Sequence, residues 1–481
     1  MKSALLLLIS ATLASAGFGP NVRIDHENNP NNNCYKPAIT LGPGTGSSQP
    51  IYVAFEDDSM DGMAGSNIMF QKSTDAGRSW LPADVLIRRG KTHASYPDIT
   101  TDPHGNVYIV CDEESNHIYC FHSTDGGATW SSPSSVDDAN EVVGWVRIVA
   151  DSAGNLLCAW NGDRTGALHI WSSVSTDQGT TWSQSVIVDD DTTNSGCFQP
   201  DVFVQPRTNH YLVAAGVPDP SGPHYDCYLY RSTDMGQTFQ PGVRLDTFEG
   251  YSFCGEPHVV ADAQHIICDY TATSANGSPV AEARTLYVQP DTWGSPYYIS
   301  PDQEGGALAI SADGRVHIVL MVAQPTGVNL TRYASSSDHG VSWSIPELVT
   351  DDTTADSQEP DIAADSAGHG FVVWHDWRTG NGWILFATNS PAAIAEQPQQ
   401  PQRHGTQLFA TMVRSVLFLA EATSPKLEAS SLLDIGGRKI MDLTPGANDV
   451  SRLSPGVYFI REGLGIRGEG LGKTQKVVVT R

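Results

Sequence analysis

The sequence of 481 residues has almost no long stretch in which apolar residues recur every 3.6 positions, and this absence excludes a largely helical fold. Basic residues are also scarce, since residues 17–400 hold 16 Lys/Arg against 47 Asp/Glu, a net charge of −31. Such an acidic body lacks the positive footprint that phosphates require, so we expect no nucleic-acid partner. After residue 16 no apolar run is long enough for a transmembrane helix, and the mature chain should be soluble or surface-attached.

The N-terminus has the pattern of a secretory signal. Lys2 precedes a short apolar run, Ala4 to Leu13, and Ala14-Ser15-Ala16 offers a small-residue cleavage site. The apolar run is about half the roughly 20 residues that a membrane-spanning helix needs. We therefore predict a signal peptide over residues 1–16 and a secreted or cell-surface protein that is exported through the periplasm.

Cysteine is confined to the first part of the chain, between Cys34 and Cys268. Eight cysteines, an even number, in an exported protein permit disulfides. Cys111 and Cys120 flank a predicted hairpin and could face each other across it. Free buried thiols explain the same pattern equally well, so both interpretations stay open.

A turn motif, Ser-x-Asp-x-Gly-x-x-Trp/Phe (the Asp box), occurs five times. It lies at residues 73–80, 123–130, 175–182, 232–239 and 336–343. Successive starts are 50, 52, 57 and 104 residues apart, and the last gap is two periods. A repeat without its box is therefore expected over residues 256–298.

A second marker has the same period. A Pro-x-Ile/Val strand start occurs at Pro37, Pro97, Pro200, Pro257 and Pro360, and Val146-Arg147-Ile148 and Leu308-Ala309-Ile310 fill the two remaining slots. Seven repeats of about 50 residues, each with four short strands, predict an all-β, seven-bladed β-propeller over residues 20–390. Six blades plus an irregular segment is the alternative.

The first strand is predicted to close the ring. The seventh repeat, residues 360–390, contains only three strands. Val22-Arg23-Ile24-Asp25, ahead of the first repeat, resembles the fourth strand of another repeat, Val186 to Asp189. By completing the last blade, the N-terminal strand would remove an exposed sheet edge.

The aspartates of the Asp boxes are interpreted as structural. An Asp in such a turn accepts backbone N–H bonds, the Gly permits a positive φ, and the aromatic residue anchors the turn. A residue repeated in every unit cannot mark one unique site. The aspartates concerned are Asp75, Asp125, Asp177, Asp234 and Asp338.

The C-terminal region reads as a separate module. Residues 391–407 form a Pro/Gln-rich linker, and residues 408–481 contain short alternating strands typical of a small β-sandwich. Leu432 to Ile440, Leu453 to Arg461 and Lys476 to Arg481 resemble the C-terminal sorting domain of bacterial proteins secreted by the type IX system. That resemblance implies the secretion machinery as a partner. A binding module attached to an enzyme is the alternative.

The Asp boxes resemble those of the sialidase (BNR-repeat) superfamily, over nearly all of residues 20–390. The resemblance implies a glycan-directed protein and, for true sialidases, six blades, an arginine triad, a Tyr/Glu nucleophile pair and an Asp acid/base. Here the counterpart of the early Arg-Ile-Pro motif, Val22 to Asp25, lacks the proline. The strand Cys254 to Val260 resembles the Glu-bearing strand of the family, but Asp269-Tyr270 stands where an arginine is expected. The weak catalytic candidates are Glu256, Tyr270 and Arg147.

One constellation is independent of the family. The residue after each strand-start proline, or its equivalent, is Ala38, Asp98, Arg147, Asp201, His258, Ala309 and Asp361. If the first strand is innermost, these residues form a polar ring around the central channel that could bind a cation or a sugar. The competing interpretation is that they satisfy backbone groups at strand ends.

These observations favour an exported propeller that binds a glycan, a surface polysaccharide or another partner without a complete sialidase catalytic set. An exo-α-sialidase-type glycoside hydrolase is the alternative. Trp145, Trp171, Trp377 and Trp383 are the expected exposed aromatics for glycan binding. No cofactor is required, although the acidic loops at Asp189-Asp190-Asp191 and Asp351-Asp352 are candidate calcium sites.

Overall fold

The structure is a computed structural model. It describes residues 17–391 except 27–32, 59–65, 91–93, 140–142, 165, 193–195, 220–223, 247–250, 275–278, 288–291, 302 and 379. Of the C-terminal part it describes residues 411–413, 416–419, 430–433, 438–444, 446–450, 453–454, 456–461 and 474–479. The predicted signal peptide 1–16 and nearly all of the predicted linker lie outside the described residues. The chain divides into two units, Met1–Gln397 and Pro398–Arg481.

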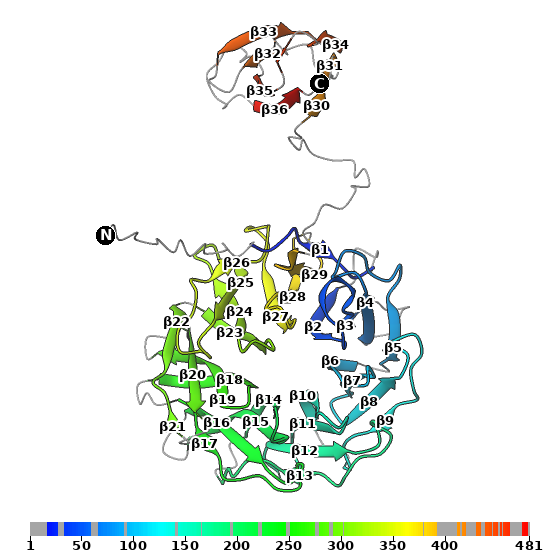
Figure 1. Cartoon of the computed structure of the whole chain (residues 1–481). Coiled ribbons are helices and arrows are strands. Elements are labelled where there is room, and N and C mark those ends of the chain that lie inside the picture. The colour runs from blue at the N-terminus through cyan, green and yellow to red at the C-terminus, as the bar shows by residue number, and fades with distance from the viewer. Residues whose placement is uncertain are drawn as a thin grey trace, which may run out of the picture. The chain divides into compact units, whose positions relative to one another are not determined.

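The first unit is a ring of seven antiparallel sheets, which confirms the predicted seven-bladed propeller (Figure 1). Blade 1 contains β2 (Cys34–Leu41), β3 (Ile51–Asp57), β4 (Asn67–Ser73) and β5 (Val85–Arg89). Blade 2 contains β6 (Ala94–Thr101), β7 (Val107–Glu113), β8 (His117–Ser123) and β9 (Ser134–Ser135). Blade 3 contains β10 (Val143–Ala150), β11 (Leu156–Gly162), β12 (His169–Ser175) and β13 (Val186–Ile187). A short 3₁₀ helix, η1 (Gly46–Ser48), lies between β2 and β3.

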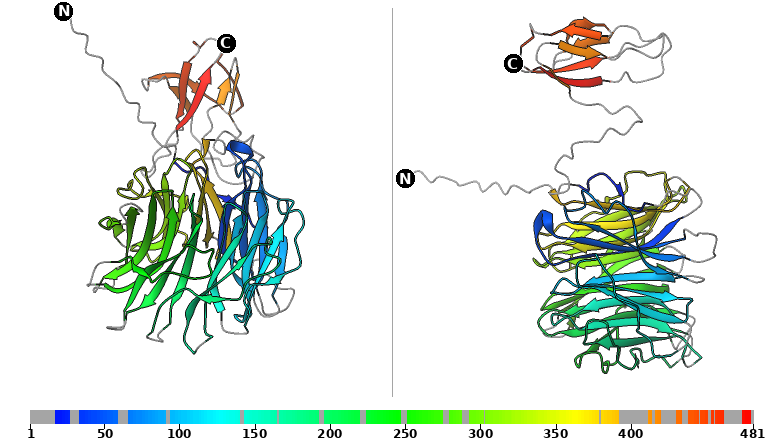
Figure 2. Two further views of the ribbon diagram at one scale, coloured as in Figure 1. Left: turned by 60° about the horizontal axis from the view of Figure 1, so that its bottom comes forward. Right: turned by 90° about the vertical axis from the view of Figure 1, so that its right-hand side faces the viewer.

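The next three blades include the repeat that lost its Asp box. Blade 4 contains β14 (Phe198–Gln205), β15 (His210–Pro218), β16 (Tyr225–Ser232) and β17 (Val243–Arg244). Blade 5, which lacks the box, contains β18 (Tyr251–Ala261), β19 (His265–Ser274), β20 (Pro279–Tyr287), β21 (Thr292–Trp293) and β22 (Tyr297–Pro301). Blade 6 contains β23 (Gln303–Ile310), β24 (Val316–Ala323), β25 (Asn329–Ser336) and β26 (Glu347–Leu348). The right-hand view of Figure 2 shows the strands running along the direction in which Figure 1 is viewed.

The N-terminal strand closes the ring, as predicted. Blade 7 contains β27 (Ser357–Ala364), β28 (Gly370–Asp376) and β29 (Trp383–Thr388), and β1 (Val22–Arg23) pairs with β29 through Val22–Phe386 and Arg23–Leu385. Just after β1, Asp25 Oδ2 accepts the N–H of Ile384 at 2.8 Å. A segment at the start of the chain thus supplies the outer edge of the last blade.

The core lies between the blades, because each sheet packs both of its faces against its neighbours. All seven residues of β7 are buried, as are all seven of β11 and of β28. This explains the continuous apolar character of the second strand in each repeat, since a strand covered on both faces loses the alternation of apolar and polar residues.

Of the two interpretations of the cysteines, free buried thiols are confirmed and a bridge between Cys111 and Cys120 is wrong. In the β7–β8 hairpin Cys111 pairs with Tyr119 and Cys120 pairs with Val110, so the two cysteines lie one position out of register. Their side chains therefore project from opposite faces of the sheet. All eight cysteines are free and buried.

The Asp boxes have the expected structural geometry. In the first box Asp75 Oδ1 accepts the N–H of Ser79 at 2.8 Å, and Asp75 Oδ2 accepts the Ser79 hydroxyl at 2.6 Å. The N–H of Gly77 donates to Ser73 Oγ at 2.9 Å, and Gly77 has a φ of +85°. The same bonds recur at Asp125, Asp177, Asp234 and Asp338.

The second unit is a small all-β module. One sheet has the strand order β30 (Thr411–Val413), β36 (Thr474–Val479), β35 (Gly456–Arg461), β32 (Ser430–Leu433) and β33 (Lys439–Leu443). A second sheet pairs β31 (Val416–Leu419) with β34 (Gly446–Asp449). Leu432, Leu443 and Val450 form its buried cluster. Among the described residues of the whole chain, no helix is long and apolar enough to cross a membrane.

Candidate functional site

The innermost strand of every blade contains a β-bulge at the same place. In β2 the pairing with β3 breaks between Tyr35 and Ala38, and in β27 it breaks between Gln358 and Asp361. A residue within six of the seven bulges has a positive φ of 44–51°, a strained conformation for a side chain other than glycine. These six are Lys36, Tyr96, Trp145, Gln199, Glu256 and Glu359, called the bulge row here.

Two residues after each bulge-row residue comes the predicted polar ring. Asp98, Arg147, Asp201, His258, Asp361 and Ala38 line one central cavity of about 430 Å³ together with the bulge row. The sixth-blade position predicted at Ala309 is wrong. There the register breaks between Glu304 and Ala307, and Ala307 is the residue that lines the cavity. This blade lacks the proline marker, so the sequence pattern placed its equivalent residue two positions too far along the chain.

The three ring aspartates link neighbouring blades. Asp98 Oδ2 accepts the N–H of Ile148 at 2.7 Å, and Asp201 Oδ2 accepts the N–H of Val259 at 2.8 Å. Asp361 Oδ2 accepts the N–H of Ile39 at 2.8 Å across the closure of the ring. Each carboxylate therefore satisfies a backbone group of the next blade, as the competing interpretation expects, while it also lines the cavity.

Burial sets the protonation of these carboxyls. Loss of hydration raises the pKa of Asp98 to about 7 and that of Asp361 to about 6, although the charge of Arg147 and the backbone N–H bonds act in the opposite direction. Burial alone lowers the pKa of His258, but the charge of Asp269, 3.2 Å away, raises it to about 9. His258 is thus a cation at neutral pH.

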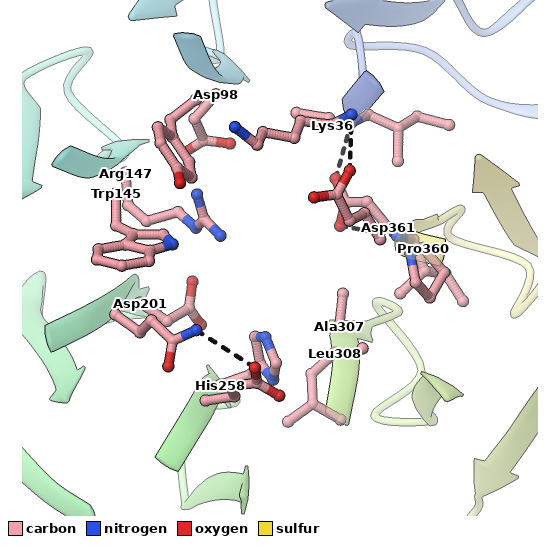
Figure 3. Close-up of a pocket in the computed structure, with 18 of the residues that line it drawn as sticks. Lys36, Asp98, Trp145, Arg147, Asp201, His258, Ala307, Leu308, Pro360 and Asp361 are labelled. Atoms are coloured by element: carbon pink, nitrogen blue, oxygen red, sulfur yellow. Dashed lines mark hydrogen bonds between the residues drawn. The ribbon is translucent and has the colours of Figure 1, made fainter. Parts of the chain in front are cut away.

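Arg147 projects into the centre of the cavity (Figure 3). Its guanidinium donates to the carbonyl of Val146 at 3.1 Å. Among the described residues no carboxylate oxygen lies within 4 Å of it, and no other arginine lines the cavity. Arg147 therefore retains donors that a bound anionic or hydroxyl-rich group can use.

The bulge row forms contacts around one side of the cavity. The Lys36 ammonium lies 3.6 Å from the centre of the Tyr96 ring and 3.1 Å from Glu56 Oε1. The Tyr96 and Trp145 rings pack with centroids 5.4 Å apart. Gln199 Nε2 in blade 4 donates to Glu256 Oε1 in blade 5 at 3.3 Å. Aromatic rings and hydrogen-bonding groups thus line the same cavity.

Only two of the three catalytic candidates line the cavity. Glu256 and Arg147 line the cavity, but Tyr270 does not. Tyr270 is fully buried in a hydrophobic cluster within blades 4 and 5, where its hydroxyl donates to Glu282 Oε2 at 2.9 Å. Tyr270 and Glu282 match a nucleophile and its base in chemistry, yet no substrate reaches a fully buried hydroxyl without opening of the blade.

The predicted exposed aromatics and the predicted calcium loops have different outcomes. Of the expected aromatics, Trp145 lines the cavity, whereas Trp171 is only 6% exposed and packs in the core, so its predicted exposure is wrong. Asp189 binds the N–H of Ile170, and Asp351 pairs with Arg378 at 2.8 Å. Calcium binding at the two acidic loops stays a prediction.

The bulge row as a set was not predicted from the sequence, which singled out only Glu256 and Trp145 of its six members. Its signal was present, since five of its members immediately precede a strand-start proline. A proline normally forces the residue before it into an extended conformation. Nothing in the repeat pattern alone indicates that a bulge turns this residue toward the channel instead.

Part of the propeller is similar in sequence to a known family. Residues 110–249, which contain three of the five Asp boxes, match the family described as BNR repeat-like domain. Over these residues the chain is similar to BNR-repeat proteins. No curated protein sequence matches the chain.

Several solved structures are similar to this chain at low sequence identity. One is a protein of unknown function from Dyadobacter fermentans, with 14% identity, 78% of this chain and 99% of that chain covered, and a TM-score of 0.48. A polysaccharide lyase of family PL25, an ulvan lyase, has 12% identity, coverage of 78% and 91%, and a TM-score of 0.46. The NanB sialidase of Streptococcus pneumoniae has 11% identity, coverage of 75% and 68%, and a TM-score of 0.43.

Proposed function

We propose that the protein is an exported, sialidase-like β-propeller that binds a glycan in its central cavity without a complete sialidase catalytic set. The observation that carries the proposal is the Arg147 guanidinium, which projects into the cavity with no carboxylate within 4 Å among the described residues. A guanidinium in this position can donate two parallel bonds to a carboxylate or a sulfate group. The ligand that fits best is therefore an acidic saccharide.

The surroundings of Arg147 support a saccharide rather than a bare anion. Tyr96 and Trp145 offer aromatic rings to the cavity, and Gln199 and Glu256 offer polar groups. A cavity of about 430 Å³ lies within the range of small-molecule sites, which is roughly 300–1,000 Å³. Sugar rings have apolar faces and hydroxyl edges that match such a lining.

The sialidase alternative finds less support in the same cavity. Arg147 is the only arginine among its described lining residues, so an arginine triad is not assembled there. Tyr270, the tyrosine candidate, is buried elsewhere. Binding without sialidase chemistry therefore accounts better for the residues that are present.

Export remains part of the proposal, and the C-terminal unit supports it. The three segments that resemble the sorting domain fall on strands β32 and β33, on β35 and on β36, which are neighbours in one sheet. We propose that this module addresses the chain to the type IX secretion machinery. Expression in a bacterium that has this system, with and without residues 398–481, tests the role, since the truncated chain, which keeps the predicted signal peptide, should stop in the periplasm.

The binding proposal is tested by isothermal titration calorimetry with uronic-acid, sulfated, sialylated and neutral oligosaccharides. Arg147→Gln should weaken binding of the acidic ligand by at least about tenfold, because hydrogen bonds to a charged group contribute about 1.5–3 kcal/mol. Arg164→Gln is the matched control, since Arg164 pairs with Asp138 at 2.8 Å outside the cavity and should leave affinity unchanged. Equal affinities of the Arg147 variant and the natural chain would contradict the proposal. Hydrolysis of sialosides by the natural chain would favour the alternative.

A further inference from the structure

A second cluster of chemically active side chains lies away from the cavity, between blades 5 and 6. It consists of Asp262 in the turn after β18, of His265 at the start of β19, and of His339 in the Asp box of blade 6. Thr285 of blade 5 donates to the carbonyl of His339 at 2.7 Å, so the box is anchored on the neighbouring blade. Two elements that are distant in sequence thus present two imidazoles and one carboxylate to each other.

The two oxygens of Asp262 have different tasks. Oδ1 accepts the backbone N–H of Gln264 at 2.7 Å and that of His265 at 2.8 Å, which fixes the turn. Oδ2 faces the imidazoles, with His265 Nδ1 at 3.0 Å and His339 Nδ1 at 2.8 Å. Oδ1 thus fixes the turn and also lies 3.1 Å from His265 Nδ1, while Oδ2 is the oxygen that faces both rings.

The imidazoles are arranged poorly for hydrogen bonding alone. Their rings stack at 4.0 Å between centroids with an interplanar angle of 19°. His339 Nδ1 is buried and makes no hydrogen bond, because its contact with Asp262 Oδ2 is close but badly aligned. A cation satisfies both nitrogens and the carboxylate oxygen together only after the rings turn, because each nitrogen lone pair lies in its own ring plane and stacked planes do not converge on one ion.

The spacing fits a metal ion. The three ligand atoms all lie within 4.8 Å of one another. Ligand bonds of about 2.0–2.2 Å in a tetrahedral zinc site place donor atoms roughly 3.3 Å apart, so the two oxygen–nitrogen separations of 3.0 and 2.8 Å need to widen by about 0.3–0.5 Å. The side chains are 17–35% exposed, which leaves access for the ion and for water as a fourth ligand.

We propose that Asp262, His265 and His339 bind a divalent transition-metal ion, with Zn²⁺ the best fit, and that the ion joins blade 5 to blade 6. Imidazole ligands favour Zn²⁺ and its neighbours over Ca²⁺, which prefers an all-oxygen shell. Within the part of the chain that the structure describes, no other blade pair brings two imidazoles and a carboxylate together. In the other four Asp boxes the position of His339 is held by Ala76, Gly126, Gln178 and Met235.

A comparable group, His169, Asp189 and Cys197, has a different explanation. Asp189 accepts the N–H of Ile170 and pairs with His169. The same device recurs in other blades, where Asp137 pairs with His117 and Asp246 with Arg244. A repeated pairing in which the cationic partner is a histidine in one blade and an arginine from another strand in the next is a structural feature of the blade, not a metal site.

The test is Zn²⁺ titration of the chelator-treated full chain by calorimetry, together with thermal unfolding with and without Zn²⁺. His339→Gln is the decisive variant, because Gln178 occupies the same box position at nearly the same φ, 61° against 60°. We expect loss of one Zn²⁺ equivalent, or an affinity reduced by more than the 10–100-fold that loss of a supporting residue costs. The Zn²⁺-dependent rise in Tm should disappear with it.

His369→Gln is the matched control, since His369 pairs with Asp365 at 2.8 Å in the corresponding turn of blade 7, where the described residues form no group of three metal-ligating side chains. It should retain the Zn²⁺ equivalent. Co²⁺ gives an independent readout, because a tetrahedral site colours the natural chain and not the His339 variant. Should His339→Gln fold with an unchanged metal-free Tm and still bind Zn²⁺ with the same stoichiometry and affinity, the proposal is overturned. A natural chain that binds no Zn²⁺ overturns it as well.

Discussion

At the scale of single residues, the ring aspartates combine two tasks. Asp98, Asp201 and Asp361 each bind a backbone N–H of the next blade, and each also lines the cavity. The marker Pro-x-Ile/Val was sufficient to locate them in the sequence. Their partners could not be predicted, because a backbone N–H is present at every residue and only the docking of two blades selects one.

Asp98→Asn should change how stability depends on pH. The folded-state pKa of Asp98, about 7, exceeds the unfolded value of about 3.9, so the folded chain holds an extra proton between these values. The stability of the natural chain therefore falls as pH rises from about 4 to about 7, by roughly 1.4 kcal/mol for each pKa unit. Asparagine does not titrate and keeps an acceptor for Ile148. Urea unfolding should find Asp98→Asn more stable than the natural chain at pH 8, with a gap that closes toward pH 4.

Asp98→Ala is the control for that experiment. It leaves the N–H of Ile148 without its acceptor and should lower stability by about 1–3 kcal/mol. A difference between Asp98→Asn and the natural chain that stays constant from pH 4 to pH 8 would contradict the assigned pKa.

At the scale of elements, the Asp box is both a turn and an interface between blades. A Cβ added at Gly77 would lie 2.2 Å from Phe386 of blade 7, and one at Gly127 would lie 2.5 Å from Phe70 of blade 1. The glycine of the box is therefore needed for its positive φ and also for close packing on the preceding blade. The turn could be predicted from its pattern, but the neighbour could not.

Gly77→Ala and Gly166→Ala separate these two effects. Both glycines have a similar φ, +85° and +89°, so alanine is strained by about 1–2 kcal/mol at either position. Only Gly77 is crowded, since nothing lies within 4 Å of a Cβ at Gly166. Denaturant unfolding should show Gly77→Ala to be less stable than Gly166→Ala by a further 1–3 kcal/mol or so. Equal losses would mean that the box does not pack tightly on blade 7.

At the scale of the whole molecule, a ring needs a closure, and β1 provides it. β1 pairs with β29 across more than 350 residues of sequence, and Asp25 binds the N–H of Ile384 beside it. Ile24 is only 1% exposed. The last blade without this segment would have a free edge and an uncovered apolar patch.

Deletion of residues 20–26 should therefore lower the Tm by several degrees and broaden the unfolding transition. Burial of one isoleucine alone contributes about 1.5–3 kcal/mol, and the β1–β29 pairing adds to it. A deletion of the same length within residues 391–407, the predicted linker, is the control and should leave the Tm unchanged. Differential scanning calorimetry measures both, and equal Tm values for the two deletions would refute the closing role of β1.

The sequence by itself determined the repeat, the number of blades, the turns and the strand that closes the ring. These features depend on local chemistry, such as an Asp that caps a turn or a strand start that recurs about every 50 residues. Their residues can therefore be identified in the sequence without knowledge of the contacts between blades. Only the tertiary structure decided that Lys36, Trp145 and Glu256 turn into the channel, that Ala307 takes the place predicted for Ala309, and that His339 meets Asp262. The reason is physical: a bulge, a register and a contact between blades arise from the packing of whole sheets, and no short segment of sequence contains them.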